Sequence, residues 1–566
     1  MLYMGDDNLQ DRRRAFLKTV AAAGAVGLAG CTGGDGGDGG SGDGGDGGDG
    51  SSGDGGGGTT TAGQPKEGGT LNVAQVSSPV ELDPVNNNGG NYSIMIKSKV
   101  YSSLFDFDAD TNITPLLATE IPELTNGGTE FTINIDERAE FHNGDPVTAE
   151  DVKYSFLQPV RESTSWASNF SIIDSIEIQD ETTAQFTLKR PYKPILYAME
   201  HPIAPKSVRE EDPEAFGTET IVGSGPFQVT DFQEGEVTRL EGWDDYWGNS
   251  APYLDRVNIT PINEATTRIT QLQTGNQDII RSVPPKLFNT VDNQQDSSVV
   301  SGPGLSYQFA AFNQNEGECT KRDVRLAIDH CVDLDSAVEK FVQPAGERLY
   351  SPLPTAVAEA WDMPVGEWRN SWSAKDIDRA KELFEQAGVP DDWECKILVS
   401  STEFRRQMAV SIANGIQEAG YDASVQYIDF SQMLEVYNSG DAERLNMYLL
   451  GWTRAPEPDR FLYELLYIDG AFQGQYYTDE RFNELLEMAH TETDREKRRE
   501  MYIEAINIFI EDRVHLPLYT TKIAMGVNNR VQDFEPVPIS TKNPYLFGER
   551  LGTNADVEGN NVWVDS

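Results

Sequence analysis

The side chains most able to do chemistry are four cysteines and five histidines, and their spacing predicts neither a metal site nor a catalytic site. No C-x-x-C pair is present and the histidines are dispersed along the chain, so a zinc cluster is not expected. Gly223-Ser224-Gly225-Pro226 lacks both the spacing of a nucleophile elbow and the Gly-Lys of a phosphate loop. We therefore expect no catalytic residue, no bound metal and no cofactor; a hydrolase that uses paired carboxylates is the alternative.

Cys31 is the cysteine to which the sequence assigns a reaction. It ends Leu28-Ala29-Gly30-Cys31, which is similar to the lipobox at which a signal peptide is cut and the new terminal thiol is lipid-modified. The apolar run over residues 20–29 is shorter than the roughly 20 residues that span a bilayer. Arg13-Arg14 and the residues after it resemble a twin-arginine export signal. Residues 1–30 are predicted to be a lipoprotein signal that leaves Cys31 anchored at the outer face of the cytoplasmic membrane.

The other three cysteines are Cys319, Cys331 and Cys395, and an odd number gives no disulfide framework. Cys331 lies inside an apparent helix, which favours free thiols. A bridge between Cys319 and Cys331 is the alternative.

Residues 31–69 are almost entirely glycine, aspartate, serine and threonine after the cysteine. Such a segment cannot bury apolar surface, so it is predicted to be a disordered tether between membrane and folded domain. A calcium-binding β-roll would need a large apolar residue in each repeat, and none occurs here.

The net charge of −47 comes from 92 acidic and 45 basic residues spread along the whole chain. Repulsion of this size destabilises a folded state in dilute buffer, whereas molar salt shortens the Debye length to about 3 Å. The composition is therefore typical of an extreme halophile. It also argues against nucleic acid as a partner, because phosphate binding needs a cationic face.

From Thr70 onward, strand and helix patterns alternate, which predicts an α/β fold. Apolar alternation indicates strands at residues 131–135, 176–178 and 184–188. Thr148, with Asp151 three residues later, has the pattern of a helix capping box. Further helices are expected at residues 375–388, 482–490 and 495–512. About 500 residues exceed one hydrophobic core, so at least two lobes with a cleft between them are expected.

A series of motifs occurs in one fixed order along this globular region. The motifs are Leu82-Asp83-Pro84, Phe141-His142-Asn143-Gly144-Asp145-Pro146-Val147-Thr148-Ala149-Glu150-Asp151-Val152, Val222-Gly223-Ser224-Gly225-Pro226-Phe227, Tyr246-Trp247-Gly248, Asp323-Val324-Arg325-Leu326-Ala327-Ile328, Gly451-Trp452 and Val514-His515-Leu516-Pro517-Leu518-Tyr519. Together they resemble family 5 of the extracellular solute-binding proteins, the oligopeptide- and dipeptide-binding components of ABC importers. The resemblance covers residues 70 to about 527.

This resemblance implies a periplasmic-binding-protein-like fold of two hinged lobes with an extra domain. By motif position, lobe I comprises residues 70–103, 222–302 and 525–566. The extra domain is residues 104–221, and lobe II is residues 303–524. The implied partners are a permease and its ATPase, and the family is usually monomeric.

The resemblance also implies that a solute binds between the lobes. By alignment, the candidate contacts in the cleft are Asn91, Tyr92, Trp166, Tyr307 and Trp452. Trp452 is the strongest of them, because the preceding strand would deliver it to the cleft.

The loop after Trp452 departs from the pattern of peptide binders. In those proteins an aspartate shortly after the tryptophan pairs with the peptide's amine, whereas here Thr453 and Arg454 follow. Arg454 could pair with a carboxylate or a phosphate of the solute. Glu457 or Asp459 could still pair with the amine. The missing aspartate therefore weakens the interpretation of this chain as a peptide binder, and peptide binding stays an open alternative.

The function implied is capture of peptides, or of peptide-sized polar organic solutes, for delivery to an ABC permease. A solute-sensing lipoprotein would use the same cleft. Uptake of a metal chelate is a further alternative, which the sparse histidines disfavour.

Overall fold

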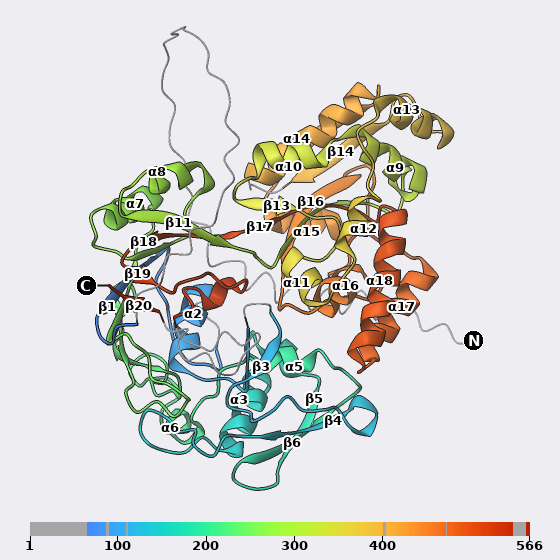
Figure 1. Cartoon of the computed structure of the whole chain (residues 1–566). Coiled ribbons are helices and arrows are strands. Elements are labelled where there is room, and N and C mark those ends of the chain that lie inside the picture. Colours follow the sequence, from blue (N-terminus) through green and yellow to red (C-terminus); the bar gives the residue numbers. More distant parts are fainter. Residues whose placement is uncertain are drawn as a thin grey trace. The chain divides into compact units, whose positions relative to one another are not determined.

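The described part of the chain is built on two large mixed sheets and one small antiparallel sheet (Figure 1). In this computed structural model the described residues are 65–86, 90–108, 111–399, 403–470, 472–546 and 562–565. The predicted signal, Cys31 and the tether up to residue 64 lie outside them. Residues 65–69 already pack on the folded region: the Gly68 N–H donates to the Tyr253 carbonyl (2.7 Å) and the Gly69 N–H to the Asp255 carboxylate (3.1 Å).

The first large sheet draws its strands from three separate stretches of sequence. In spatial order the strands are β11 (Ser297–Gly302), β18 (Ile523–Asn528), β10 (Ile279–Arg281), β1 (Thr70–Gln75), β9 (Arg256–Pro261), β8 (Thr238–Gly242) and β7 (Phe227–Asp231). Side chains alternate between the faces of a strand. Leu71 and Val73 of β1 therefore pack towards α2 (Gly90–Val100), while Ala74 packs towards α7 (Ala265–Gln273) and α8 (Phe288–Asp292).

The second large sheet is covered by helices on both faces (Figure 1). Its strands, in order, are β13 (Gly346–Arg348), β17 (His515–Thr521), β12 (Ser306–Phe312), β16 (Met447–Thr453), β14 (Glu394–Val399) and β15 (Asp422–Tyr427). One face carries α9 (Arg322–Cys331), α10 (Leu334–Phe341), α13 (Ile377–Gln386) and α14 (Glu403–Glu418). The other carries α11 (Thr355–Ala360), α12 (Val365–Arg369), α15 (Phe430–Ser439), α16 (Asp459–Leu466), α17 (Glu480–Thr491) and α18 (Arg495–Glu511).

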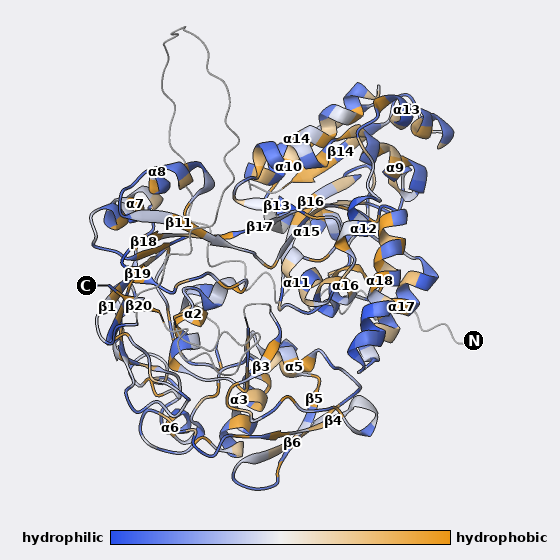
Figure 2. Cartoon of the chain, viewed as in Figure 1, coloured by the Kyte–Doolittle hydropathy of each residue, from blue (hydrophilic) through white to orange (hydrophobic). Residues whose placement is uncertain are grey.

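Alternation along β12 explains why this sheet has two cores. Tyr307, Phe309 and Ala311 belong to the core under α16–α18, whereas Ala310 and Phe312 belong to the core under α9 and α14. Nearly the whole strand is buried, as expected for a central strand with helices on both sides. Figure 2 shows the corresponding hydrophobic strands inside and hydrophilic outer faces on the helices.

The third sheet and its helices lie between β1 and β7 in the sequence. The elements here are β2 (Phe105–Phe107), β3 (Ile113–Pro115), β4 (Glu130–Asn134), α3 (Ala149–Glu162), α4 (Ala167–Phe170), β5 (Ile173–Ile178), β6 (Thr183–Leu188), α5 (Ile195–Ala198) and α6 (Lys206–Glu211). The third sheet has the order β4-β6-β5, and β2 and β3 form a separate two-stranded ribbon. Phe131 and Phe186 stack at 4.8 Å, and Phe156 of α3 meets Phe186 edge-on at 5.7 Å. The strands β19 (Val531–Gln532) and β20 (Trp563–Val564) come after β18 in the sequence and pair as a small antiparallel ribbon.

The predicted α/β class and local elements are confirmed. The three expected strands are β4, β5 and β6, and the later helices are α13, α17 and α18. Thr148 and Asp151 form the predicted capping box at the start of α3, with Thr148 N–H donating to Asp151 at 2.9 Å. Gly388, just beyond α13, has a φ of +66°, the left-handed conformation in which glycine ends a helix without strain.

The three described cysteines are free thiols, as favoured from the sequence. All three are buried. Burial raises the pKa of Cys319 and of Cys331 to about 12, so both remain unreactive thiols at neutral pH.

Two short segments join the large sheets: residues 303–305 lead from β11 to β12, and Lys522 leads from β17 to β18. The Thr520 hydroxyl donates to the Gly304 carbonyl at 3.2 Å, and the Ser306 and Thr521 hydroxyls are 2.8 Å apart. A Cβ on Gly304 would lie 2.1 Å from the Thr521 carbonyl oxygen, so glycine is required for this close approach.

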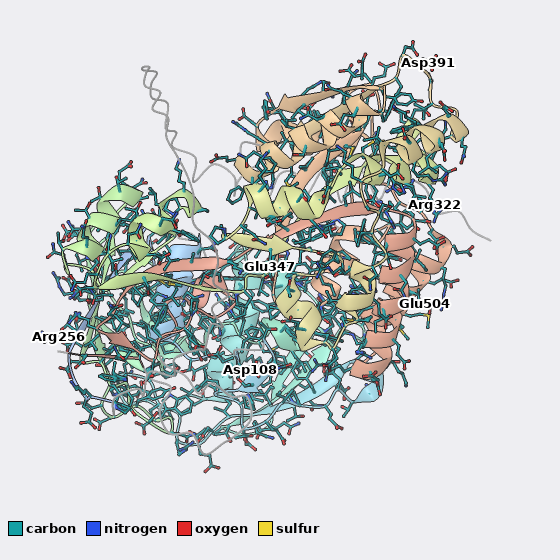
Figure 3. The ribbon with its side chains drawn as sticks, turned by 45° about the horizontal axis from the view of Figure 1, so that its top comes forward. Asp108, Arg256, Arg322, Glu347, Asp391 and Glu504 are labelled. Atoms are coloured by element: carbon teal, nitrogen blue, oxygen red, sulfur yellow. The ribbon has the colours of Figure 1, made fainter. Side chains whose placement is uncertain are left out.

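Charged side chains stand outward around the ribbon, among them the labelled Arg256, Arg322, Asp391 and Glu504 (Figure 3). Salt can screen charges at such exposed positions. No helix in the described ranges has the length and apolar character needed to cross a membrane.

Candidate functional site

A cavity of about 490 Å³ lies where the three sheet-based regions meet. Its wall comprises one face of α2, the segment after α5, the starts of β12 and β18, the ends of β16 and β17, and the chain from Pro538 to Lys542. Cavities of this size hold small organic ligands, and they form where separate structural units meet. The cavity is therefore the candidate binding site.

Helical spacing explains which residues α2 presents to the cavity. Asn91, Ile94 and Ser98 follow the i, i+3, i+7 pattern of one helix face, and all three line the wall. Tyr92 lies about 100° further around the helix and is not a lining residue. It faces the charges of Arg268 and Arg281 instead.

Strand alternation similarly separates neighbours on β12 and β16. Ser306 pairs in register with Thr453, and both line the cavity. Tyr307 and Trp452, the next register pair, do not line it. Tyr307 is fully buried and stacks on Phe309 at 4.8 Å.

Trp452 lies behind the wall of the cavity and supports the side chain of Arg454. Its Nε1–H donates to the Arg460 carbonyl at 2.9 Å, and its ring packs against Phe472 at 4.4 Å. The guanidinium of Arg454 lies over the Trp452 ring, 3.8 Å from the centroid. The tryptophan thus orients an arginine that does line the cavity.

Arg454 is partly committed to the protein itself. Its Nε donates to Glu464 at 3.1 Å and its Nη1 to the Thr453 carbonyl at 3.1 Å. Glu464 also pairs with Arg460 at 2.6 Å. The Glu464 carboxylate thus serves two guanidinium groups, and the Asp459 carboxylate acts on Arg460 as a further nearby charge. Burial lowers the pKa of Arg454.

Glu457 and Asp459 are buried and do not line the cavity. Glu457 forms an ion pair with Arg498, and it accepts the Asp459 backbone N–H at 2.7 Å. Asp459 accepts from His490 Nδ1 at 2.9 Å, while Arg190 donates to His490 Nε2 at 2.6 Å. Both carboxylates are therefore engaged by side chains of the chain itself.

Three charged wall residues were not singled out from the sequence: Asp106, Glu200 and Lys542. Lys542 pairs with Asp106 and lies 3.7 Å from Glu200. Burial raises the pKa of Glu200, and Lys542 opposes that shift. These residues come from β2, from the segment after α5 and from the C-terminal region, so no local sequence pattern connects them.

Lys97 is a further charged wall residue that the sequence did not indicate. Its ammonium donates to the carbonyls of Asp83 (3.0 Å) and Asn86 (2.6 Å). Burial lowers the pKa of Lys97 to about 8. Its spacing from Asn91 and Ile94 on α2 is the only signal that could have found it.

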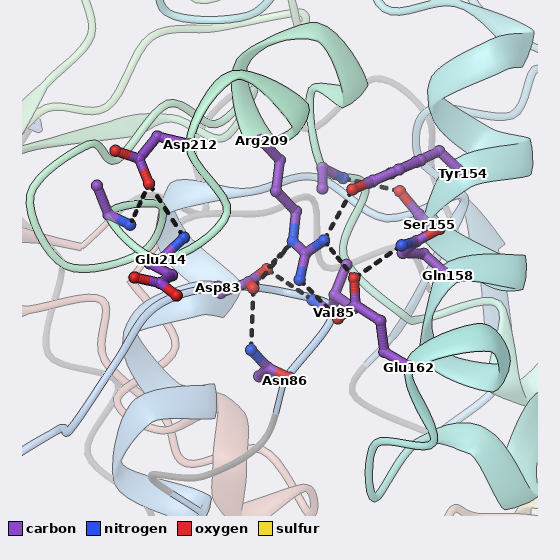
Figure 4. Close-up of polar contacts among 12 residues, drawn as sticks. Asp83, Val85, Asn86, Tyr154, Ser155, Gln158, Glu162, Arg209, Asp212 and Glu214 are labelled. Carbon is purple, nitrogen blue, oxygen red and sulfur yellow. Dashed lines mark hydrogen bonds and ion pairs between the residues drawn. The ribbon is translucent and has the colours of Figure 1, made fainter.

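The chain that holds Lys97 is fixed by the Asp83 carboxylate of the Leu82-Asp83-Pro84 motif (Figure 4). Arg209 Nε lies 3.1 and 2.9 Å from the two Asp83 oxygens. The Arg209 terminal nitrogens donate to Glu162 (2.9 Å each) and to the Tyr154 hydroxyl (2.7 Å). This buried network ties α3 and α6 to the loop before α2, and so sets the position of Lys97.

Aromatic side chains close the wall near Lys97. Trp166 and Phe170 line the cavity, and both rings pack on His201, at 5.5 and 4.8 Å. The Trp166 Nε1–H donates to the Asn86 carbonyl at 3.3 Å. Among the residues predicted from the sequence, Asn91, Trp166, Thr453 and Arg454 are thus brought together around the cavity.

Comparison with known proteins agrees with this architecture. The family described as bacterial extracellular solute-binding proteins, family 5 Middle, matches residues 112–473. The oligopeptide-binding protein AppA of Bacillus subtilis is 24% identical over 507 residues, which is 84% of this chain and 91% of that protein.

Two solved structures share the fold over most of their length. HbpA2 of Haemophilus parasuis has a TM-score of 0.75 at 24% identity, covering 83% of this chain and 97% of that one. DppA of Helicobacter pylori, in complex with the peptide STSA, has a TM-score of 0.66 at 24% identity, covering 88% and 99%. At these identities the likeness establishes the fold alone.

Proposed function

The chain belongs to family 5 of the bacterial extracellular solute-binding proteins, and on that premise we propose that it is the membrane-tethered solute-binding component of an ABC importer. It captures peptides, or peptide-sized polar organic solutes, and presents them to a permease and its ATPase. The observation that carries the proposal is the cavity of about 490 Å³ walled by three separately cored regions.

The proposed division is lobe I at residues 70–103, 222–302 and 525–566, an extra domain at 104–221, and lobe II at 303–524. The strand composition of the three sheets supports it, except that β18 of the first sheet already begins at Ile523. The two crossings at residues 303–305 and at Lys522 are the proposed hinge, because few backbone torsions there connect the large sheets.

Contacts between the extra domain and lobe II support a closed state. Arg190 reaches His490, and Arg460 donates to the Tyr192 hydroxyl at 3.4 Å. A solute that fills the cavity adds contacts to both sides, so it favours closure by its differential affinity for the closed form.

The chemistry of the wall supports a polar organic solute with charged ends. Apolar side chains such as Ile94 and Leu305 alternate there with Lys97, Glu200 and Arg454. AppA is named as an oligopeptide-binding protein and DppA was solved with a peptide, which makes peptides the first solutes to test. Arg454 is the proposed partner of a carboxylate or phosphate group, while Asn91, Trp166 and Thr453 are proposed contacts.

The proposed membrane attachment, through a lipid on Cys31 and the glycine- and aspartate-rich tether, rests on the sequence, and so does the proposed adaptation to molar salt. A net charge of −47 is compatible with a stable fold when the Debye length is about 3 Å. The proposed site of action is the outer face of the cytoplasmic membrane, where the protein acts as a monomer.

The test is mass spectrometry of small molecules released when the protein, purified in molar KCl, is denatured. Wild type should release a solute in stoichiometric amount, and Arg454→Ala should release clearly less. Arg481→Ala removes a half-exposed arginine that pairs with Glu484 and Glu504, so it serves as the matched control and should release as much as wild type. The proposal fails if wild type releases nothing and binds none of a panel of peptides and organic anions.

A further inference from the structure

Glu200 is a carboxylate in the cavity wall whose hydrogen-bonding capacity the chain itself leaves largely unused. It lies in the segment after α5, and 32% of its side chain is accessible. Burial raises the pKa of Glu200, which places that accessible part in the cavity and not at the outer surface. Among the described residues, Lys542 Nζ approaches Glu200 Oε2 to 3.7 Å, and no other group donates to this carboxylate. A distance of 3.7 Å is longer than an ordinary N–H···O bond.

Lys542 only partly neutralises Glu200, because it serves two carboxylates. It forms the closer ion pair with Asp106. Asp106 also accepts the Phe107 backbone N–H at 2.7 Å and the Tyr545 hydroxyl at 3.4 Å, so its oxygens are well supplied with donors. On Glu200, Asp106 acts as a like charge and Lys542 as an opposite charge. The two neighbours therefore have opposing effects on the ionised Glu200.

The next cation, Lys99, does not supply the missing charge. Its ammonium donates to the carbonyls of Met95 (2.9 Å) and Lys542 (3.2 Å), and its charge acts on Asp106. Of the described charges, those of Lys542 and Asp106 are the ones that act on Glu200. A cation brought by a solute would thus meet a carboxylate that the protein has not paired closely.

The backbone around Lys542 is held by contacts that do not involve Glu200. The amide oxygen of Asn543 accepts the Val537 N–H at 3.0 Å, and its amide nitrogen donates to the Val537 carbonyl at 2.7 Å. The Lys542 carbonyl accepts from Lys99 on α2. These bonds fix the chain on both sides of Lys542 and direct its ammonium to Asp106.

Resting on the proposed function, we propose that Glu200 is a subsite for a cationic nitrogen of the solute, such as a primary ammonium group. The ammonium donates to the Glu200 carboxylate and supplies the charge that Lys542 provides only in part. Arg454, from lobe II in the proposed division, lines the same cavity, so a solute with an amine and a carboxylate can meet both groups. The two acids that the sequence offered for an amine, Glu457 and Asp459, are buried and do not line the cavity.

The contact should remain effective in molar salt. Salt screens exposed charges strongly, whereas buried or partly buried pairs are screened much less. A hydrogen bond to a charged group is also stronger than one between neutral groups, which corresponds to a roughly 10- to 100-fold effect on affinity.

The test is isothermal titration in molar KCl with trialanine and with its des-amino analogue, in which a hydrogen replaces the terminal ammonium. Both probes keep the same carboxylate and the same peptide bonds, and the analogue adds no bulk. Wild type should bind trialanine roughly 10- to 100-fold tighter than the analogue. Equal affinity of wild type for the two probes overturns the subsite.

Two variants assign the effect to Glu200. Glu200→Gln keeps the shape of the side chain and removes its charge, so it should weaken trialanine binding by about 10-fold or more and leave the analogue unchanged. Glu177→Gln removes an exposed carboxylate of β5, off the cavity, and is the matched control that should bind both probes as wild type does. The subsite is overturned if Glu200→Gln weakens both probes equally, or neither.

Folding stability separates a solute contact from a structural ion pair. Because burial disfavours the ionised form of Glu200, Glu200→Gln should unfold at the same urea concentration as wild type or at a higher one. If Glu200 served mainly to pair with Lys542, the variant would unfold at a lower urea concentration, and that result contradicts the proposal.

Failure of the subsite and failure of the proposed function are distinguishable. If wild type binds neither probe, the comparison of Glu200→Gln with wild type is made with the solute that denatured wild type releases. A released solute without a cationic nitrogen, or one that both proteins bind equally, overturns the subsite and leaves the import function standing. A cationic solute that Glu200→Gln binds about 10-fold or more weakly supports the subsite without peptides. Release of no solute, together with no binding of either probe, overturns both.

Discussion

Glu457 gives the sharpest test of which acidic residues serve the fold and which serve the solute. The sequence left Glu457 as a candidate partner for the amine of a solute, whereas in the fold Glu457 is buried against Arg498. We predict that Glu457→Leu destabilises the protein severely and does not act selectively on solute binding.

The magnitude follows from what loses a partner. Leucine keeps most of the volume but removes the acceptor of the Arg498 guanidinium and of the Asp459 backbone N–H. Leaving one member of a buried ion pair uncompensated costs about 3–5 kcal/mol. Arg498 keeps bonds to the Ala489 carbonyl (3.1 Å) and the Tyr502 hydroxyl (2.8 Å), so a loss of about 3 kcal/mol is expected.

The assay is urea unfolding in molar KCl followed by tryptophan fluorescence, with titration of solute into the folded variant. The matched control is Glu504→Leu, which breaks the half-exposed pair with Arg481 and should change stability by less than about 1 kcal/mol. The reasoning is refuted if Glu457→Leu unfolds at the wild-type urea concentration while solute affinity collapses, because that result would make Glu457 a ligand contact.

Three further predictions address the network around the site, one buried histidine and the surface charge. Arg209→Met removes the cation that pairs with Asp83 and Glu162 and donates to the Tyr154 hydroxyl, so it should lower stability by about 3–5 kcal/mol and weaken solute binding through Lys97. The exposed Arg138→Met should do neither, and unchanged urea curves and titrations for Arg209→Met would contradict this prediction. Burial lowers the pKa of His515 to about 3 from an unfolded value of about 6.5, so the unfolded state gains a proton first and stability is lost as pH falls from about 6.5 towards 3, by about 2 kcal/mol at about pH 5. His515→Phe should remove this loss of stability, which is measured by urea unfolding at neutral pH and at about pH 5. If variant and wild type show the same pH dependence, the His515 ring is not held in a buried, neutral form. Raising KCl from low to molar concentration should raise the unfolding midpoint, because it screens a net charge of −47, while sucrose of equal osmolarity should do less; a midpoint that falls with KCl would oppose the halophilic interpretation.

Local structure could be predicted from the sequence where residues close together in the chain determine it. Alternation at β4–β6, the Thr148 capping box and the glycine after α13 each depend on residues a few positions apart. These elements are confirmed because local hydrogen bonding and the buried face act in the same direction.

Only part of the site could be predicted from the sequence, because neighbouring residues on one strand or helix point to different sides. Thr453 and Arg454 line the cavity, whereas Trp452 lies one residue earlier on the same strand and turns into the core. Tyr307 and Ser306 show the same one-residue difference, and Tyr92 is one helical position from Asn91. Position in a motif locates a segment, but the side of the strand or helix that meets the cavity depends on how the sheets pack.

Other site residues had no local signal at all. Asp106, Glu200 and Lys542 come together from three distant segments, and His201 is isolated in sequence from Lys97 and Tyr101. Conversely, Glu457 and Asp459 looked available in the sequence, but Arg498 and His490 from later helices reach them in the fold. Contacts between residues so far apart depend on tertiary packing, which single-sequence patterns do not encode.

The central claim is that a solute is held in the cavity between the large sheets, and a cavity-filling variant tests it most directly. Ala455 lines the wall, so Ala455→Trp should occupy the space, while Thr267→Trp adds the same ring to an exposed position of α7. Native mass spectrometry should show a bound small molecule on wild type and on Thr267→Trp, and none on a folded Ala455→Trp. Equal occupancy of all three proteins would contradict the account, because the solute would then bind elsewhere.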